Sequence, residues 1–207
     1  MPNVNRKDRL TYRQQQALAT RMHIVANAKR LFLVQGYTST TIEAIASEAG
    51  VAVSTVYAVF GNKRSILGAI CEAWLEEAQI RPLMEQALAE PSIRERLKLA
   101  ARWTRQQWER GAEVLPLLQA ASHDDPEVAA MLASWIADKS AAMMHFVASL
   151  KGTLRPDLDV QRAGHIFDAL TIPEIYRDLI NRSGWSPSEY EHWLFETLAN
   201  QLLTLDG

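Results

Sequence analysis

The sequence predicts an all-α protein with about nine helices arranged in two domains. Apolar residues recur at intervals of three and four along nearly the whole chain, whereas the alternation typical of strands is almost absent. Capping residues, glycines and prolines divide this pattern into segments, as expected for separate helices. The 207 residues exceed one average domain, and 48% of apolar residues is enough to build a buried core.

Four helices are expected in the N-terminal part of the chain. They run from Tyr12 to Gln35, from a cap at Thr40 or Thr41 as far as Gly50, from Val53 to Val59, and from a cap at Asn62 towards Leu75. Gly36 and Gly50 are the expected end points of the first two, because glycine readily takes the positive φ at which many helices end. The capping side chains can accept hydrogen bonds from the first N–H groups of a helix.

Five further helices are expected in the C-terminal part. They run from Ser92 to Arg110, from Val114 to Ala121, from Pro126 to Leu150, from Asp159 to Asn181 and from Pro187 to Leu205. Asp125 followed by Pro126 is a helix start signal, and Ser186 with Glu189 forms a capping box. Pro173 predicts a kink in the fourth of these helices.

Residues Thr41–Phe60 have the pattern of a helix-turn-helix. Two short helical segments are joined by a tight turn at Gly50, and small residues, Ala46 and Ala49, stand where the helices cross closely. The turn and the second segment direct three apolar residues towards the core: Val51, Val56 and Phe60. The opposite face, which is the one that would enter a DNA major groove, carries Val53, Ser54 and Tyr57.

Residues from Arg21 to Leu67 resemble the DNA-binding domain of the TetR family of transcriptional regulators. The resemblance lies in a string of residues: Gly36-Tyr37, Thr40-Thr41-Ile42, Ile45-Ala46, Ala49-Gly50-Val51, Thr55-Val56-Tyr57, Phe60 and Lys63. It implies that Thr41, Tyr57 and Lys63 bind DNA phosphates, and it includes Thr40 in the DNA-binding surface. The residues that it places nearest the base edges are Ala52, Val53, Ser54 and Thr55.

The expected recognition helix, Val53–Val59, has few side chains that form hydrogen bonds. Family members often carry Ser or Thr where Ala52 stands, so this helix lacks a cap worth about 1 kcal/mol. Val53 can touch a thymine methyl group, and Ser54 can reach several bases. Part of the specificity can also come from DNA shape, or from a minor-groove arm at Arg6–Arg13.

Charge is unevenly distributed along the chain. Residues 1–64 carry nine Lys and Arg against three Asp and Glu, and the remaining residues carry thirteen against 21. A basic N-terminal part on an acidic remainder indicates that the N-terminal part meets a polyanion. The alternative to a polyanion-binding N-terminal part is a basic disordered tail. The alternatives to DNA contacts are that the Tyr57 ring packs in the core and that Lys63 is a solvated charge.

The stretch from Leu170 to Leu203 is similar to the last two helices of many TetR-type regulators, which form a four-helix bundle between subunits. The final helix carries more apolar surface than one neighbouring helix is expected to cover: Tyr190, Trp193, Leu194, Leu198, Leu202 and Leu203. A homodimer through the last two helices is therefore expected. Its two-fold axis would present two recognition helices to major grooves about 34 Å apart, on an inverted-repeat operator in double-stranded DNA.

Aromatic, methionine and polar side chains between these two regions indicate a cavity for a small-molecule effector. The candidate ligand-binding residues are Trp103, Gln107, Trp135, His145, Phe167, Thr171 and Tyr176. The alternative is that the aromatic residues are ordinary core. The five histidines have no metal-ligand spacing, and neither a metal ion nor another cofactor is expected.

The resemblance implies a repressor that binds operator DNA through residues 12–64 and is released when an effector binds residues 65–207; activation is the alternative. No paired-carboxylate site, Ser-His arrangement or phosphate loop stands out, so an enzyme is not expected, and a helical adaptor without DNA binding is the other rival. The absence of an apolar run of about 18 residues and of a secretory signal predicts a cytoplasmic protein without a membrane partner. The single cysteine, Cys71, excludes an internal disulfide and is interpreted as a buried thiol, with a sensor thiol as the alternative.

Overall fold

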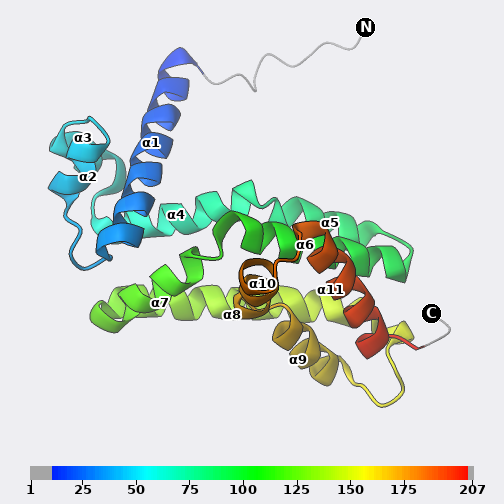
Figure 1. Ribbon diagram of the computed structural model, residues 1–207. Helices are drawn as coiled ribbons and strands as arrows, with labels where there is room; N and C mark the ends of the chain where they lie inside the picture. Colours follow the sequence, from blue (N-terminus) through cyan, green and yellow to red (C-terminus); the bar gives the residue numbers. More distant parts are fainter. Residues whose placement is uncertain (1–10, 205–207) are drawn as a thin grey trace, which may run out of the picture. The chain divides into compact units, whose positions relative to one another are not determined.

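The computed structural model describes residues 11–204 (Figure 1). These residues form eleven α-helices and no β-strand, apart from an isolated bridge between Leu154 and Leu203, so the predicted all-α class is confirmed. The chain divides into two compact units, the first ending at Cys71 and the second beginning at Glu72. The assignment of DNA binding to residues 12–64, and of ligand binding and dimerisation to residues 65–207, stays a prediction.

The first unit contains the first three of the four helices predicted for the N-terminal part, α1 (Tyr12–Gln35), α2 (Ile42–Glu48) and α3 (Val53–Phe60) (Figure 1). Gly36 ends α1 with a φ of 84°, and Gly50 takes a φ of 62° in the turn between α2 and α3. Both values lie in the region that favours glycine, as the predicted turns require. The buried residues of this unit include Ile24, Ala28, Leu31, Phe32, Ile45, Ala46, Val56 and Phe60.

α4 (Lys63–Glu77) begins at its expected cap, where the Asn62 Oδ1 accepts a hydrogen bond from the Ser65 N–H at 2.9 Å. Cys71 on this helix is buried, as interpreted from the sequence. A helix that the sequence pattern did not predict, α5 (Ile80–Ala89), follows directly. The break between them is at Gln79, whose φ of 52° is left-handed. Glutamine carries no signal for this conformation, which explains why no break was expected here.

Six further helices complete the second unit. They are α6 (Ile93–Gly111), α7 (Val114–Asp124), α8 (Pro126–Ala148), α9 (Val160–Leu170), α10 (Pro173–Arg177) and α11 (Pro187–Leu202). α6 packs against α5 and α11, and α8 packs against α7 and α9 (Figure 1). Both predicted caps are present, since the Asp125 carboxylate accepts hydrogen bonds at the start of α8 and Ser186 with Glu189 closes a capping box at the start of α11.

The helix predicted from Asp159 to Asn181 is divided in two. α9 ends at Leu170 and α10 begins at Pro173, because proline has no N–H group to continue the hydrogen-bond ladder. Residues 178–182 then form a π-helical segment. This division and the unpredicted α5 raise the nine expected helices to the eleven found among residues 11–204.

Among the described helices, none is by itself long and apolar enough to cross a membrane. α2 and α3 meet the same criteria of length and composition only when they are taken together, and this pair is bent by 110° at its break.

Candidate DNA-binding surface and ligand cavity

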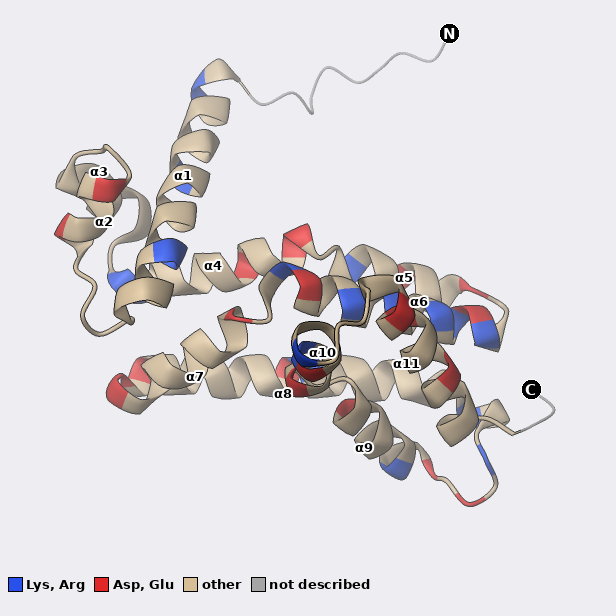
Figure 2. Ribbon diagram, viewed as in Figure 1, with Lys and Arg blue, Asp and Glu red and all other residues tan. Residues whose placement is uncertain are grey.

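The face of α3 that the spacing predicted to be outward is exposed. Accessible fractions are 36% for Val53 and 49% for Tyr57, and Ser54 is also exposed, whereas Val56 and Phe60 are buried. α3 contains no Lys, Arg, Asp or Glu (Figure 2). The surface that it offers is therefore an uncharged one with a hydroxyl, a phenol and a branched apolar chain.

The starts of α2 and α3 are capped differently. The Thr41 Oγ1 accepts a hydrogen bond from the Ala44 N–H at 3.1 Å, and Thr41 is exposed. Ala52, which is also exposed, provides no side-chain hydrogen bond at the start of α3, as expected from the sequence. Thr55, in the first turn of α3, is half-buried. The first N–H groups of α3 therefore depend on water or on a bound anion.

Thr40 does not lie on the surface where the resemblance placed it. Its side chain is only 1% exposed, and its Oγ1 donates a hydrogen bond to the Gly36 carbonyl oxygen at 2.8 Å. The hydroxyl thus stabilises the turn between α1 and α2. Sequence reasoning could not separate Thr40 from Thr41, because either threonine is a suitable helix cap.

Lys63 has its ammonium group on backbone oxygens. The Nζ donates to the carbonyl oxygens of Tyr37, Thr38 and Thr40 at 2.7, 3.3 and 3.0 Å, and it lies 4.3 Å from the centre of the Tyr37 ring. An ammonium group has three N–H donors, so these three acceptors match its capacity. Lys63 therefore ties the start of α4 to the turn that follows α1, and a phosphate would compete with these carbonyl groups.

Other basic side chains of the first unit also have partners within it. Arg30 on α1 pairs with Glu48 on α2, and the Arg21 guanidinium lies 4.6 Å from the centre of the Phe60 ring. The expected arm at Arg6–Arg13 lies largely outside the described residues, and its last member, Arg13, is exposed on α1.

Two of the predicted ligand-binding residues belong to a packed aromatic core in the second unit. The Trp103 and Phe167 rings are buried and lie 6.3 Å apart, and both pack against Phe146, at 4.8 and 5.7 Å. The Trp103 and Phe146 rings meet edge to face and the other two pairs are tilted, and such packing at these distances is typical of a protein core. The alternative of ordinary core packing therefore describes these two side chains.

Gln107 and Thr171 are buried at the ends of two indole hydrogen bonds. The Trp74 Nε1 donates to the Gln107 carbonyl oxygen at 2.7 Å, and the Trp108 Nε1 donates to the Thr171 carbonyl oxygen at 2.9 Å. The Thr171 hydroxyl in turn donates to the Phe167 carbonyl oxygen. These backbone oxygens hold the two indole rings in fixed orientations.

Tyr176 is buried against Tyr190, with ring centres 4.9 Å apart. Burial raises the pKa of the Tyr176 hydroxyl, and the nearby Glu109 carboxylate raises it further. The Tyr190 hydroxyl is fully buried and has no hydrogen-bond partner within the described residues, and burial likewise raises its pKa. Both phenols therefore stay protonated near neutral pH.

His145 and Trp135 are placed differently from these core residues. His145 is exposed on α8, one residue before the buried Phe146, so it does not join the aromatic core. Trp135, on the same helix, is half-buried and lines a cavity of about 290 Å³ between α7, α8 and the segment around Pro173. Trp135 is thus the predicted ligand-binding residue with a cavity beside it.

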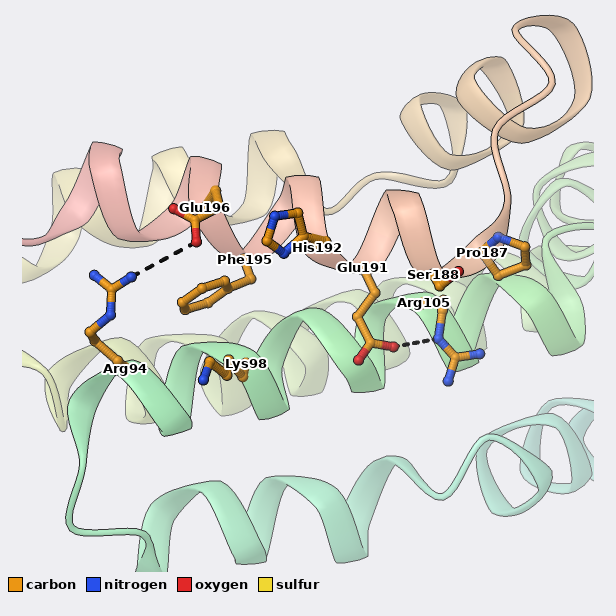
Figure 3. A pocket seen from close by; sticks show the side chains of 9 residues that line it. All are labelled: Arg94, Lys98, Arg105, Pro187, Ser188, Glu191, His192, Phe195 and Glu196. Carbon is orange, nitrogen blue, oxygen red and sulfur yellow. Dashed lines mark hydrogen bonds and ion pairs between the residues drawn. The ribbon is translucent and has the colours of Figure 1, made fainter.

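A larger groove, with a volume of about 740 Å³, runs between α6 and α11 (Figure 3). Ion pairs cross it, from Arg105 to Glu191 at 2.6 Å and from Arg94 to Glu196 at 3.8 Å. Between them the Phe195 ring lies 5.2 Å from the Arg94 guanidinium. These interactions connect α6 to α11 across the groove. We therefore interpret the groove as part of the packing between these two helices.

The apolar side chains of α11 are covered inside the chain itself. Five of the six that were expected to need a partner are buried: Tyr190, Leu194, Leu198, Leu202 and Leu203. Two helices of the same chain, α6 and α9, cover this surface, so these side chains do not by themselves require a second subunit. Trp193 is the half-buried exception, and the homodimer stays a prediction.

Comparison with known proteins bears on the first unit directly. Residues 24–70 match the model of the bacterial regulatory proteins of the tetR family. The HTH-type transcriptional regulator TcmR of Streptomyces glaucescens is 36% identical over 80 residues, which is 37% of this chain and 35% of TcmR. The match therefore spans about a third of that relative's length.

Two solved structures resemble most of the chain. NalD, the secondary repressor of the MexAB-OprM multidrug efflux pump in Pseudomonas aeruginosa, has a TM-score of 0.69 at 20% identity, over 92% of this chain and 99% of NalD. The transcriptional regulator FadR from Bacillus subtilis, in complex with stearoyl-CoA, has a TM-score of 0.66 at 19% identity, over 87% and 98%. These likenesses show a common fold, and within it residues 24–70 are similar to the tetR family of bacterial regulatory proteins.

Proposed function

We propose that this chain is a DNA-binding transcriptional regulator, whose residues 12–64 bind an operator and whose residues 65–207 bind an effector and dimerise. The observation that carries the proposal is the exposed face of α3, formed by Val53, Ser54 and Tyr57, inside the residues that match the tetR family. An exposed helix face of this kind, supported by two packed helices, suits insertion into a major groove.

Each polar group near this face has a proposed role. The Thr41 hydroxyl accepts a hydrogen bond from its own helix and can still donate a hydrogen bond to a phosphate. The Tyr57 hydroxyl can also donate a hydrogen bond to a phosphate. Val53 and Ser54 would read base edges, flanked by Ala52 and Thr55. The Lys63 ammonium group would bind a phosphate only if it broke hydrogen bonds to backbone carbonyl oxygens such as that of Tyr37.

Dimerisation through the last two helices would supply the second recognition helix. The part of α11 that is left for a partner is the side that carries the exposed His192 and Asn200 and the half-buried Trp193. Two copies related by a two-fold axis would bind an inverted repeat with half-sites about 34 Å apart.

Repression with release by a small molecule is the proposed mode of regulation. NalD is a repressor, and FadR of B. subtilis was solved with stearoyl-CoA, which supports a regulator with an effector site. The effector would shift the DNA-binding equilibrium by binding one conformation more tightly than the other. A regulator of this kind acts where the chromosome is, so the cytoplasm is its proposed location.

The test is selection of duplexes from a random-sequence library by the purified full chain. We expect enrichment of an inverted repeat, with an affinity that falls steeply as salt rises because phosphate contacts release counterions. Ser47→Ala, at an exposed position of α2 away from the predicted face, is the matched control for Ser54→Ala. The absence of any enriched sequence, or an affinity that does not depend on salt, would contradict the proposal.

A further inference from the structure

The cavity beside Trp135 combines aromatic, apolar and charged walls. α6 and α8 contribute the indole rings of Trp108 and Trp135, and α8 also contributes Ile136 and Lys139. α7 adds Leu115 and Gln119, and the end of α9 and the segment that follows add Asp168, Ile172 and Glu174. A small, partly apolar hollow with a few polar groups is the usual form of a small-molecule site.

The apolar side chains that line the cavity are partly exposed to solvent. The Ile136 side chain is 50% exposed and Ile172 is 38% exposed, although both line the same hollow. Trp135 is also only half-buried. Large apolar side chains that gather at one exposed place commonly mark a binding site, because a ligand removes them from water.

The charges of the cavity favour a cation. The Lys139 ammonium and the Asp168 carboxylate pair with each other at 3.4 Å, which leaves the Glu174 carboxylate as the excess charge among the lining groups. Glu174 also lies 3.2 Å from Arg177, which does not line the cavity. An anion entering here would be repelled by two carboxylates and attracted by one ammonium group, whereas a cation would be attracted by the two carboxylates and repelled by the one ammonium group.

The tryptophan rings add an attraction for the same charge. The face of an indole ring carries negative electrostatic potential and binds cations, more strongly when water is displaced. Trp108 is held by its hydrogen bond to the Thr171 carbonyl oxygen, and Trp135 packs at 5.7 Å against Trp74. Both rings are thus positioned before any ligand arrives, which lowers the cost of binding.

We propose that this cavity is the effector site, and that the effector is an organic cation with an apolar or aromatic body. The inference rests on the proposed regulatory function and names the ligand class of that function. The ammonium group of the ligand lies beside Asp168 and Glu174, and its apolar part covers Ile136, Ile172 and the Trp135 ring. Trp135 contacts Trp74 on α4, the helix that begins at Lys63 directly after the helix-turn-helix, so occupancy of the cavity acts on that helix.

Isothermal titration calorimetry with the purified full chain tests the ligand class. The probes are benzyltrimethylammonium, neutral benzyl alcohol and anionic benzenesulfonate, which share an aromatic ring and differ in charge. We expect saturable binding of the cation at least tenfold tighter than that of either other probe. Equal or tighter binding of benzenesulfonate, or no saturable binding of the cation up to its highest practical concentration, would overturn the proposal.

Four variants locate the binding. Trp135→Leu should weaken binding of the cation about tenfold, from the loss of the ring face. Asp168→Asn, which leaves the Lys139 ammonium without its carboxylate, should also weaken it about tenfold, and the more exposed Glu174→Gln about threefold. Asp138→Asn, an exposed acid on α8 outside the cavity, is the control and should leave affinity unchanged. Unchanged affinity in Trp135→Leu and Asp168→Asn, with thermal unfolding like that of the wild type, would refute the site.

Operator binding without any probe separates this proposal from the function on which it rests. If the chain binds its operator with steep salt dependence and the cation does not bind, the effector class fails and the regulatory function stands. If the cation binds at Trp135 but no operator is selected, the site stands as a ligand site and the regulatory function fails.

Discussion

The ammonium group of Lys63 donates a hydrogen bond to the carbonyl oxygen of Tyr37 across 2.7 Å, and it lies over the ring of the same residue. Two more carbonyl oxygens, of Thr38 and Thr40, also accept hydrogen bonds from this ammonium group. The family resemblance implies a phosphate contact for this lysine, whereas these contacts make it a residue that positions the turn before α2. The two roles have different consequences when the side chain is changed.

We expect Lys63→Met to lower the free energy of unfolding by about 1–2 kcal/mol, because backbone acceptors lose a charged donor. Lys63→Arg should restore little of this stability, since a planar guanidinium cannot direct its donors at three converging carbonyl oxygens as an ammonium group does. Urea denaturation measures both changes.

The salt dependence of operator binding separates the two roles of Lys63. A direct phosphate contact accounts for a slope of about −0.9 in log K against log salt concentration. A positioning residue leaves the slope of Lys63→Met close to that of the wild type although the affinity falls. A slope shallower by about 0.9 for each protomer of the dimer, together with full recovery of binding in Lys63→Arg, would assign Lys63 to a phosphate instead.

Changes on the exposed face of α3 should separate general affinity from base preference. We expect Tyr57→Ala to weaken binding to operator and to unrelated duplexes alike, because a phosphate contact carries no sequence information. Ser54→Ala should change the preferred base at one position of each half-site, with a discrimination of about 1–3 kcal/mol. Fluorescence anisotropy with single-base operator variants measures both. If neither variant alters binding while both fold normally, the recognition surface lies elsewhere.

The helix boundaries that could be predicted are those with a local chemical signal. Thr41, Asp125 and Ser186 each cap a helix with their own side chain, which depends only on the next few residues. The break at Gln79 has no such signal, because its left-handed backbone is one that glutamine does not favour. The sequence pattern therefore missed α5.

The residues of the candidate sites could likewise be predicted only where the signal is local in the sequence. The outward face of α3 follows from helical spacing within one short segment, so Val53, Ser54 and Tyr57 could be identified. Whether His145 faces the core, or whether the leucines of α11 are covered, depends on helices distant in the sequence. Spacing along one helix identifies an apolar stripe but does not tell which neighbour covers it.

Trp193 is the α11 residue whose change should affect dimerisation. We expect Trp193→Glu to raise the dimer dissociation constant at least tenfold, because a carboxylate would have to lose its hydration in the interface. Light scattering after size-exclusion chromatography, over a range of concentrations, measures this. Val34→Glu, at an exposed apolar residue on α1, is the control. A Trp193→Glu dimer as tight as the wild type would exclude this face of α11.

At acid pH the capping box at the start of α11 should no longer contribute to the stability of the fold. The Ser186 N–H and hydroxyl groups both donate to the Glu189 carboxylate at 2.7 Å, which holds the pKa of that carboxyl below its ordinary value of 4.5. Since the pKa is lowered in the folded state, this contribution is present above pH 4.5 and is lost as the pH falls through the folded value. We therefore expect the difference in melting temperature between wild type and Glu189→Gln to shrink below pH 4.5. Glu85→Gln, on the exposed side of α5, is the comparison, and a difference that stays constant with pH would contradict the expectation.

A side chain at Gly111 should destabilise the fold, because the Trp74 indole lies against this position. A Cβ atom at this position would lie 2.4 Å from the Trp74 Cδ1. The indole cannot move aside easily, since its Nε1 is bonded to the Gln107 carbonyl oxygen and its ring packs against Trp108 and Trp135. We expect Gly111→Ala to lower the free energy of unfolding by about 1–3 kcal/mol, measured by urea denaturation. Gly152→Ala, where no atom lies within 4 Å of the new Cβ, should change it by less than about 0.5 kcal/mol. Equal effects of the two alanines would mean that Trp74 is free to shift, and that it is a poor link between the cavity and α4.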